Sequence, residues 1–97
     1  LEEGAIRRVL AQALLAQGDI AAASAELRLS EEALHEAGNR YELARTQVQR
    51  ADLFAHQGQR SSGAALLHHA FATLSELGAQ HDLALARAIA ARWEYTL

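Results

Sequence analysis

The sequence predicts an all-α fold, and three observations lead to that prediction. Residues that favour helices (Ala, Leu, Glu, Gln and Arg) make up most of the 97 positions, whereas the β-branched residues that favour strands are scarce. Proline, which interrupts helices, does not occur in the sequence. Glycines at positions 18, 38, 58 and 78 divide the chain into stretches of similar length. We therefore expect helices joined by short turns.

The expected helices span about residues 2–17, 20–37, 40–57, 60–77 and 80–96. Each break contains a glycine, which can end a helix in the left-handed conformation without steric cost. Connections this short place successive helices antiparallel. Side chains whose oxygens can favour the start of the next helix follow each break: Asp19, Asn39, Ser61 or Ser62, and Asp82.

Apolar residues recur at helical spacing and predict the buried faces. The second and fourth helices carry the clearest stripes: Ile20, Ala23, Leu27 and Leu34, and then Leu67, Ala70, Phe71, Leu74 and Leu77. In the third helix Arg50 interrupts the pattern, and we interpret it as an aliphatic stem lying on apolar surface with its guanidinium paired to a carboxylate. The fifth helix is apolar on nearly all sides over residues 83–93, so we expect a partner to cover its outer face.

The segments repeat with a period of forty residues. Gly18 matches Gly58 and Gly38 matches Gly78, and the same offset relates several apolar positions: Leu27 with Leu67, Leu34 with Leu74, and Ala11 with Ala51 and Ala91. A period of this length predicts stacked helical units, and such stacking usually creates an extended binding surface. We predict one domain over 1–97, with repeats over about 2–38 and 40–78 and an extra helix over about 80–96.

Composition argues against several function classes. The net charge of −3 does not suggest a basic face for nucleic acid, and no apolar run approaches the roughly 20 residues that span a bilayer. Cysteine is absent, and the histidines lack the spacing of three or four residues that places two ligands on one helix face. We therefore expect no enzyme activity, metal, cofactor, nucleic-acid partner or membrane partner. Because methionine is also absent, we expect the chain to be a piece of a longer polypeptide.

The order of large and small residues resembles a tetratricopeptide repeat. The positions that carry the resemblance are Leu10, Ala11, Leu14, Gly18, Asp19, Ala23 and Leu27 in the first copy, and Ala51, Phe54, Gly58, Gly63 and Leu67 in the second. The second copy departs at Arg50, where a large apolar residue is usual, and the period exceeds the family's common one of about 34. Residues 36–45 and 76–84 resemble the joints of forty-residue arrays in large bacterial signalling and transcription-control proteins.

This resemblance implies right-handed stacking of helix pairs and a concave face made mainly by the first helix of each pair. It also implies a cytoplasmic, non-enzymatic interaction module inside a larger regulatory protein, with a protein or peptide as its partner. The implied groove residues are Arg8, Gln12 and Leu15, then Arg45, Val48, Gln49, Asp52 and His56, and finally Ala88, Arg92 and Tyr95. The three arginines against a single aspartate favour an acidic segment as the ligand.

Two further possibilities concern association and architecture. The apolar fifth helix predicts an interface for self-association or for a following repeat at Leu85, Ile89 and Trp93, and hence a possible homodimer. The alternative architecture is a plain helical bundle with a structural or dimerisation role and no peptide groove. Helix pairs stacked in a row favour the interaction module, whereas helices closed around one core favour the bundle.

Overall fold

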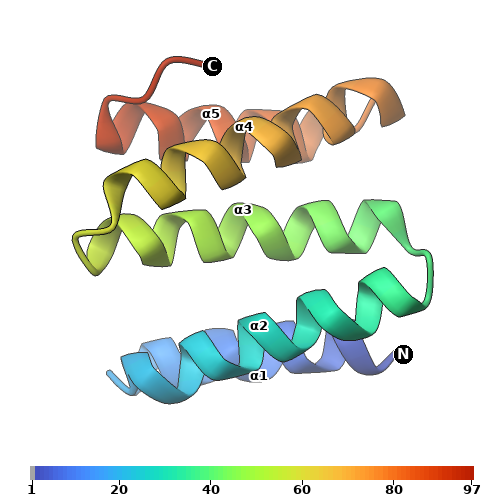
Figure 1. The fold of residues 1–97 in the computed structure, drawn as a ribbon, viewed down its shortest axis with the longest axis vertical. Coiled ribbons are helices and arrows are strands. Elements are labelled where there is room, and N and C mark those ends of the chain that lie inside the picture. Colours follow the sequence, from blue (N-terminus) through green and yellow to red (C-terminus); the bar gives the residue numbers. More distant parts are fainter. Residues whose placement is uncertain (1) are drawn as a thin grey trace.

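Residues 2–97 are described by a computed structural model, and over this range the fold is all-α (Figure 1). The helices are α1 (Glu3–Ala16), α2 (Ile20–Glu36), α3 (Arg40–His56), α4 (Arg60–Leu77) and α5 (Gln80–Trp93). The prediction of an all-α chain is therefore confirmed, and most boundaries agree with the sequence to within one or two residues. The exception is α5, which ends three residues before the expected position.

The turns before α2 and α4 are built alike, as the forty-residue repeat predicts. Gly18 and Gly58 both have φ of 80°, in the left-handed region that disfavours side chains. In each turn the residue after the glycine donates its amide back to the preceding helix, from Asp19 to the Leu14 carbonyl at 2.9 Å and from Gln59 to the Phe54 carbonyl at 2.8 Å. The reversal brings each second helix back along the first.

Two of the expected capping residues act as caps. Asp19 Oδ1 accepts from the Ala22 amide at 3.2 Å, and Asn39 Oδ1 accepts from the Glu42 amide at 3.1 Å. The starts of α4 and α5 have no side-chain cap, so neither Ser61 nor Ser62 caps α4. Asp82 lies in the first turn of α5, where its charge favours the helix start as expected, and its carboxylate also accepts from Tyr41 of α3.

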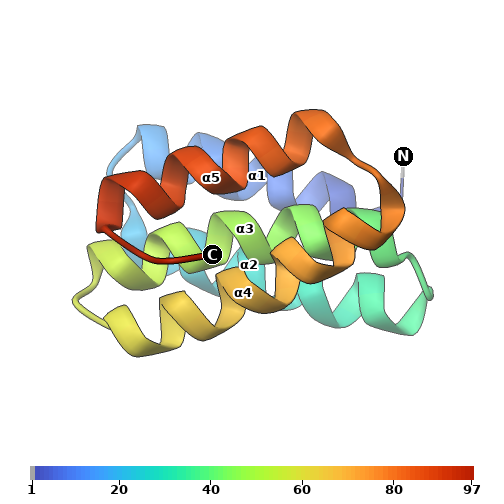
Figure 2. The ribbon, with the colours of Figure 1, turned by 90° about the horizontal axis from the view of Figure 1, so that it is seen from above.

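The helices form an open stack with two layers. Helix α1 packs on α2 and α3 packs on α4, and the pairs join through α2 with α3 and α4 with α5. In Figure 2, α1 and α5 lie on one side with α3 set back between them, and α2 and α4 lie on the opposite side. Over the described residues α5 packs on α3 and α4 but not on α1 or α2. This arrangement is the row of helix pairs expected of a repeat.

The core consists of two apolar clusters, one for each joint of the stack. The first joins α1, α2 and α3, and its buried residues are Ala11, Ala23, Leu27 and Leu53. The second joins α3, α4 and α5, and its buried residues are Ala44, Val48, Ala51, Leu67, Ala70, Leu74, Leu83, Ala86 and Ala90. Alanine supplies half of the buried residues in the first cluster and more than half in the second, so the helices approach closely and stability comes from many small contacts.

The chain reverses after α5 and returns to α4, which explains the early end of that helix. Glu94 adopts the left-handed conformation with φ of 60°. Tyr95 then donates its hydroxyl to the Arg60 carbonyl at 2.9 Å, and the Arg60 guanidinium lies 5.2 Å from the centre of the tyrosine ring. These contacts with α4 would be lost if α5 continued in a straight line to residue 96.

Gly63 lies where α4 approaches the backbone of α3 closely. A Cβ atom at this position would lie 2.9 Å from the Ala51 carbonyl oxygen and 2.9 Å from the Tyr95 hydroxyl. The tyrosine can move, but the carbonyl belongs to the α3 backbone. We expect Gly63→Ala to force the helices apart and to lower the free energy of unfolding by about 1–3 kcal/mol, measured by urea denaturation.

The matched control for this prediction is Ser62→Ala on the preceding, exposed residue of α4. Alanine is a better helix former than serine, so this change should leave stability within about 0.5 kcal/mol of the parent. Equal denaturation midpoints for the two variants would contradict the close packing of α4 on α3.

Candidate functional site

Helices α1, α3 and α5, with the start of α2 at one end, line an open groove on the face where α3 is set back. Its first hollow has a volume of about 340 Å³ and is lined by Gln12, Arg45, Val48, Gln49, Asp82, Leu85 and Ile89. Its second hollow has a volume of about 420 Å³ and is lined by Leu15, Ile20, Gln49, Asp52, Leu53, His56 and Gln57. Because Gln49 lines both hollows, they adjoin, and we call them together the α3 groove.

Apolar side chains line both hollows. Leu85 is 49% exposed, and the partly buried Ile89 lies one turn further along α5. In the second hollow Ile20, at the start of α2, is 40% exposed, and Leu15 is partly buried. Ligands commonly bind at concave sites with exposed apolar surface, because removing that surface from water is favourable.

Most of the groove residues implied by the resemblance meet in this place. Gln12, Leu15, Arg45, Val48, Gln49, Asp52 and His56 all line the α3 groove. Arg92 lies beside it, with Nη1 3.2 Å from Asp52 Oδ2. Ala88 is exposed and lines neither hollow.

Arg8 and Tyr95 lie elsewhere. Arg8 is only 5% exposed, and its guanidinium is paired with Glu42 inside the protein. Tyr95 packs on α4. The sequence interpretation also missed Ile20, Leu53, Gln57 and Asp82. The forty-residue repeat could have indicated Asp82, because it lies forty residues after Glu42. Glu42 pairs with Arg8 of α1, and Asp82 pairs in the same way with Arg45 of α3.

The three residues expected to form a self-association or next-repeat interface on α5 lie on the groove side of that helix. Leu85 and Ile89 line the first hollow. Trp93 donates its indole N–H to Asp52 Oδ1 at 2.7 Å, and its ring meets the His56 ring edge-on with centroids 4.8 Å apart. The fully exposed side of α5 carries small residues, among them Ala84, Ala88 and Ala91.

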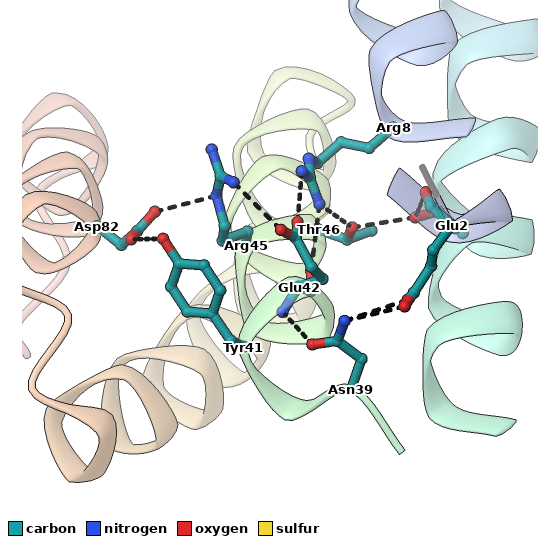
Figure 3. A network of polar contacts seen from close by, with 10 residues as sticks. Glu2, Arg8, Asn39, Tyr41, Glu42, Arg45, Thr46 and Asp82 are labelled. Atoms are coloured by element: carbon teal, nitrogen blue, oxygen red, sulfur yellow. Dashed lines mark hydrogen bonds and ion pairs between the residues drawn. The ribbon is translucent and has the colours of Figure 1, made fainter. Parts of the chain in front are cut away.

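A line of charges crosses the stack beside the first hollow (Figure 3). Arg8 Nη2 of α1 lies 2.6 Å from Glu42 Oε1 of α3. The other Glu42 oxygen lies 3.4 Å from Arg45 Nη1, whose Nε lies 3.2 Å from Asp82 Oδ1 of α5. Asp82 also accepts a hydrogen bond of 2.6 Å from the Tyr41 hydroxyl. We call Arg8, Glu42, Arg45 and Asp82 the charge relay.

Hydroxyl groups complete the buried side of this network. Arg8 Nη1 donates to Thr46 Oγ1 at 3.3 Å, and Thr46 lies 3.0 Å from the Ser30 hydroxyl. Ser30 donates to the Gly4 carbonyl at 2.6 Å. Four polar groups from α1, α2 and α3 are thereby paired in the core, where an unpaired group would be costly.

The charged side chains that line the groove already have partners of opposite sign. Arg45 is paired with Asp82, and Asp52 is paired with Arg92 and lies 3.8 Å from His56. By contrast, the side-chain amides of Gln12, Gln49 and Gln57 take part in none of the side-chain hydrogen bonds found among residues 2–97. The groove therefore offers apolar surface and free amides to a ligand.

Arg50 has the structural role expected of it. Its Nη1 lies 2.8 Å from Glu31 Oε2 of α2, and its guanidinium lies 4.8 Å from the centre of the Phe54 ring. Burial raises the pKa of Glu31, and the charge and hydrogen bond of Arg50 oppose that rise. The pair lies on the α2 side of α3, away from the groove lining.

Other kinds of site receive no support from the described part of the chain. Between residues 2 and 97 no three His, Cys, Asp or Glu side chains converge as metal ligands would. Nor does any helix in that range combine the length and apolar character needed to cross a membrane. Comparison with models of protein families, with curated proteins and with solved structures found no match.

Glu42 should be the most sensitive member of the charge relay. Glu42→Gln leaves the Arg8 guanidinium buried without its carboxylate, so we expect the free energy of unfolding to fall by about 2–3 kcal/mol. Glu32→Gln is the control, because the Arg28 and Glu32 pair is exposed and worth no more than about 0.5 kcal/mol. Equal losses in urea denaturation would show that Arg8 does not depend on Glu42.

Tyr41 should lose its proton at a higher pH than an ordinary tyrosine, because its pKa is raised. Its hydrogen bond to Asp82 raises its pKa above 10.0, because ionisation would break the bond and place a phenolate beside a carboxylate. Since the folded state holds the proton more tightly, this contribution to stability is complete below pH 10.0 and is lost as the pH rises through the higher folded pKa. Tyr41→Phe should remove the late component of an alkaline absorbance titration, whereas Tyr95→Phe should retain it.

Proposed function

We propose that this domain is a non-enzymatic interaction module that binds a peptide segment of another protein in the α3 groove. The observation that carries the proposal is the pair of adjoining apolar hollows, the first lined by α1, α3 and α5 and the second by α1, α3 and the start of α2. Three helices from successive units contribute to one surface, as expected where stacked units bind a partner. Concave apolar sites with a few polar groups are the usual places for ligands.

The finer architecture belongs to the same proposal. The open row of helix pairs, the two separate clusters and the forty-residue register support a tetratricopeptide-like stack over a plain bundle around one core, and we propose its right-handed sense from the sequence resemblance. A place inside a larger cytoplasmic regulatory protein is also proposed, and it rests on the sequence resemblance alone.

Self-association is the second candidate function, and α1 supplies the observation that favours it. Ile6 is 49% exposed, Val9 is 56% exposed and Leu10 is 46% exposed, all on this one helix. Ile6 and Leu10 lie forty residues before Thr46 and Arg50, which contact α2 in the middle of the stack. A second copy could cover this face of α1 and leave the α3 groove free.

A charge placed in the first hollow should disable the groove without unfolding the protein. The probe is a random peptide library displayed on phage and selected on the parent domain. Leu85→Glu should weaken binding of the selected peptides at least about tenfold, because half-exposed Leu85 tolerates the change but the carboxylate would be desolvated beneath the ligand. Binding would be measured by fluorescence anisotropy.

The control for this experiment is Ala72→Glu on the exposed side of α4, which should not affect binding. Selected peptides that bind both variants as tightly as the parent would place the binding site outside the groove, and a selection that yields no peptide would contradict the proposal. Sedimentation of the same proteins addresses self-association. A dimer that persists in Leu85→Glu would favour the α1 face as its interface.

A further inference from the structure

We infer that the α3 groove selects an extended, locally uncharged segment with apolar side chains at positions i and i+2, and that Gln49 reads the main chain between them. This inference rests on the proposed function and names the ligand class of the same site. Three features of the groove lead to it: the pairing of its charges, the spacing of its hollows and the free amide at their junction.

Charge pairing argues against a charged ligand segment. Arg45 is held by Asp82 and Glu42, and Asp52 is held by Arg92 and by the indole N–H of Trp93. A ligand carboxylate or ammonium over the hollows would lose its water and would have to break one of these pairs to gain a partner. Pairing thus removes the reason to expect an acidic ligand, since Arg8 is buried and the other two arginines are engaged.

The spacing of the hollows matches alternate residues of an extended chain. Along α3 the first hollow is lined by residues 45, 48 and 49 and the second by residues 49, 52, 53 and 56. Their midpoints along α3 are thus offset by about five residues, or ~7.5 Å at the rise of an α-helix. Side chains at i and i+2 of an extended segment point the same way and lie ~6.6 Å apart.

Helix α1 supports the same alignment. Its Gln12 lines the first hollow and its Leu15 lines the second, so the two hollows succeed each other in the same direction along α1 as along α3. A ligand running along α3 would therefore meet both hollows in turn. Its two anchors would contact Leu85 and Ile89 in the first and Leu15 and Ile20 in the second.

The amide at the junction distinguishes an extended ligand from a helical one. Residues i and i+4 of a helix are also ~6 Å apart, so spacing alone allows both forms. A helix uses its own N–H and C=O groups internally and would cover the Gln49 amide without pairing it. An extended segment presents an unpaired N–H and C=O at residue i+1, and a glutamine side chain can accept from the one and donate to the other.

The probe for this inference is a positional-scanning array of hexapeptides acetylated at the N-terminus and amidated at the C-terminus. We expect apolar residues to be enriched at two positions separated by one residue, with acidic and basic residues disfavoured at both. Methylation of the amide nitrogen of the middle residue should weaken binding of the best hexapeptide about tenfold, because it removes the N–H that Gln49 would accept from.

Gln49→Ala separates main-chain recognition from a change in peptide shape. It should weaken the unmethylated hexapeptide about tenfold and should abolish the difference between the methylated and unmethylated forms. Gln59→Ala, in the exposed turn before α4, is the matched control and should preserve that difference.

The outcomes that would overturn the inference are distinct from failure of the proposed function. Enrichment at a spacing of three or four residues would indicate a helical ligand, and enrichment of charged anchors would contradict the neutral groove. If methylation weakened hexapeptide binding equally in the parent and in Gln49→Ala, a hydrogen bond between Gln49 and the main chain of the ligand would be excluded. In each of these cases, weaker binding of the peptides to Leu85→Glu would still support the proposed interaction module. If no hexapeptide bound, both the inferred ligand class and the proposed function would be contradicted.

Discussion

The buried pairing of Arg8 with Glu42 is the interaction on which the arrangement of the stack depends. Most contacts between the helices are made by alanine and leucine, which favour close packing but fix direction weakly. A guanidinium that is 5% exposed must meet its carboxylate, and that requirement defines where α3 lies against α1. Through Arg45 and Asp82 the same relay reaches α5, so it links the three helices that line the groove.

Small residues determine how near the helices come once their register is defined. Gly4 faces the Leu34 side chain so closely that a Cβ atom there would collide with it, and Gly63 lies against the α3 backbone. Leucines at equivalent places in the two repeats, such as Leu27 and Leu67, are fully buried between the helix pairs. Close approach and directional pairing therefore act together, and the groove remains along α3, where α1 and α5 and the start of α2 line it.

Features that depend on neighbouring residues in the sequence, such as the helices and their turns, could be predicted. The positions of side chains that depend on contacts between distant parts of the chain could not. Glycine turns and apolar periods predicted the helices, and the partner of Arg50 was expected because a buried guanidinium needs a carboxylate. Tyr95 was misplaced because its position depends on Arg60, more than thirty residues away. The orientation of Leu85 and Ile89 was not readable, because a helix that is apolar on nearly all sides does not specify which side is buried.

The ion pairs between α3 and α5 also explain why the groove offers a ligand mainly apolar and uncharged polar groups. Arg45 and Asp82 hold α5 beside α3, and Asp52 with Trp93 holds the other end of α5. Because these side chains stabilise the position of the last helix, they are not free to attract a ligand of either sign. The shape of the first hollow depends on α5 remaining in this position, so the ion pairs create the site while adding no net charge to it. What is left for recognition is apolar surface and the unpaired amides of Gln12 and Gln49, which suit a main chain better than a charged side chain.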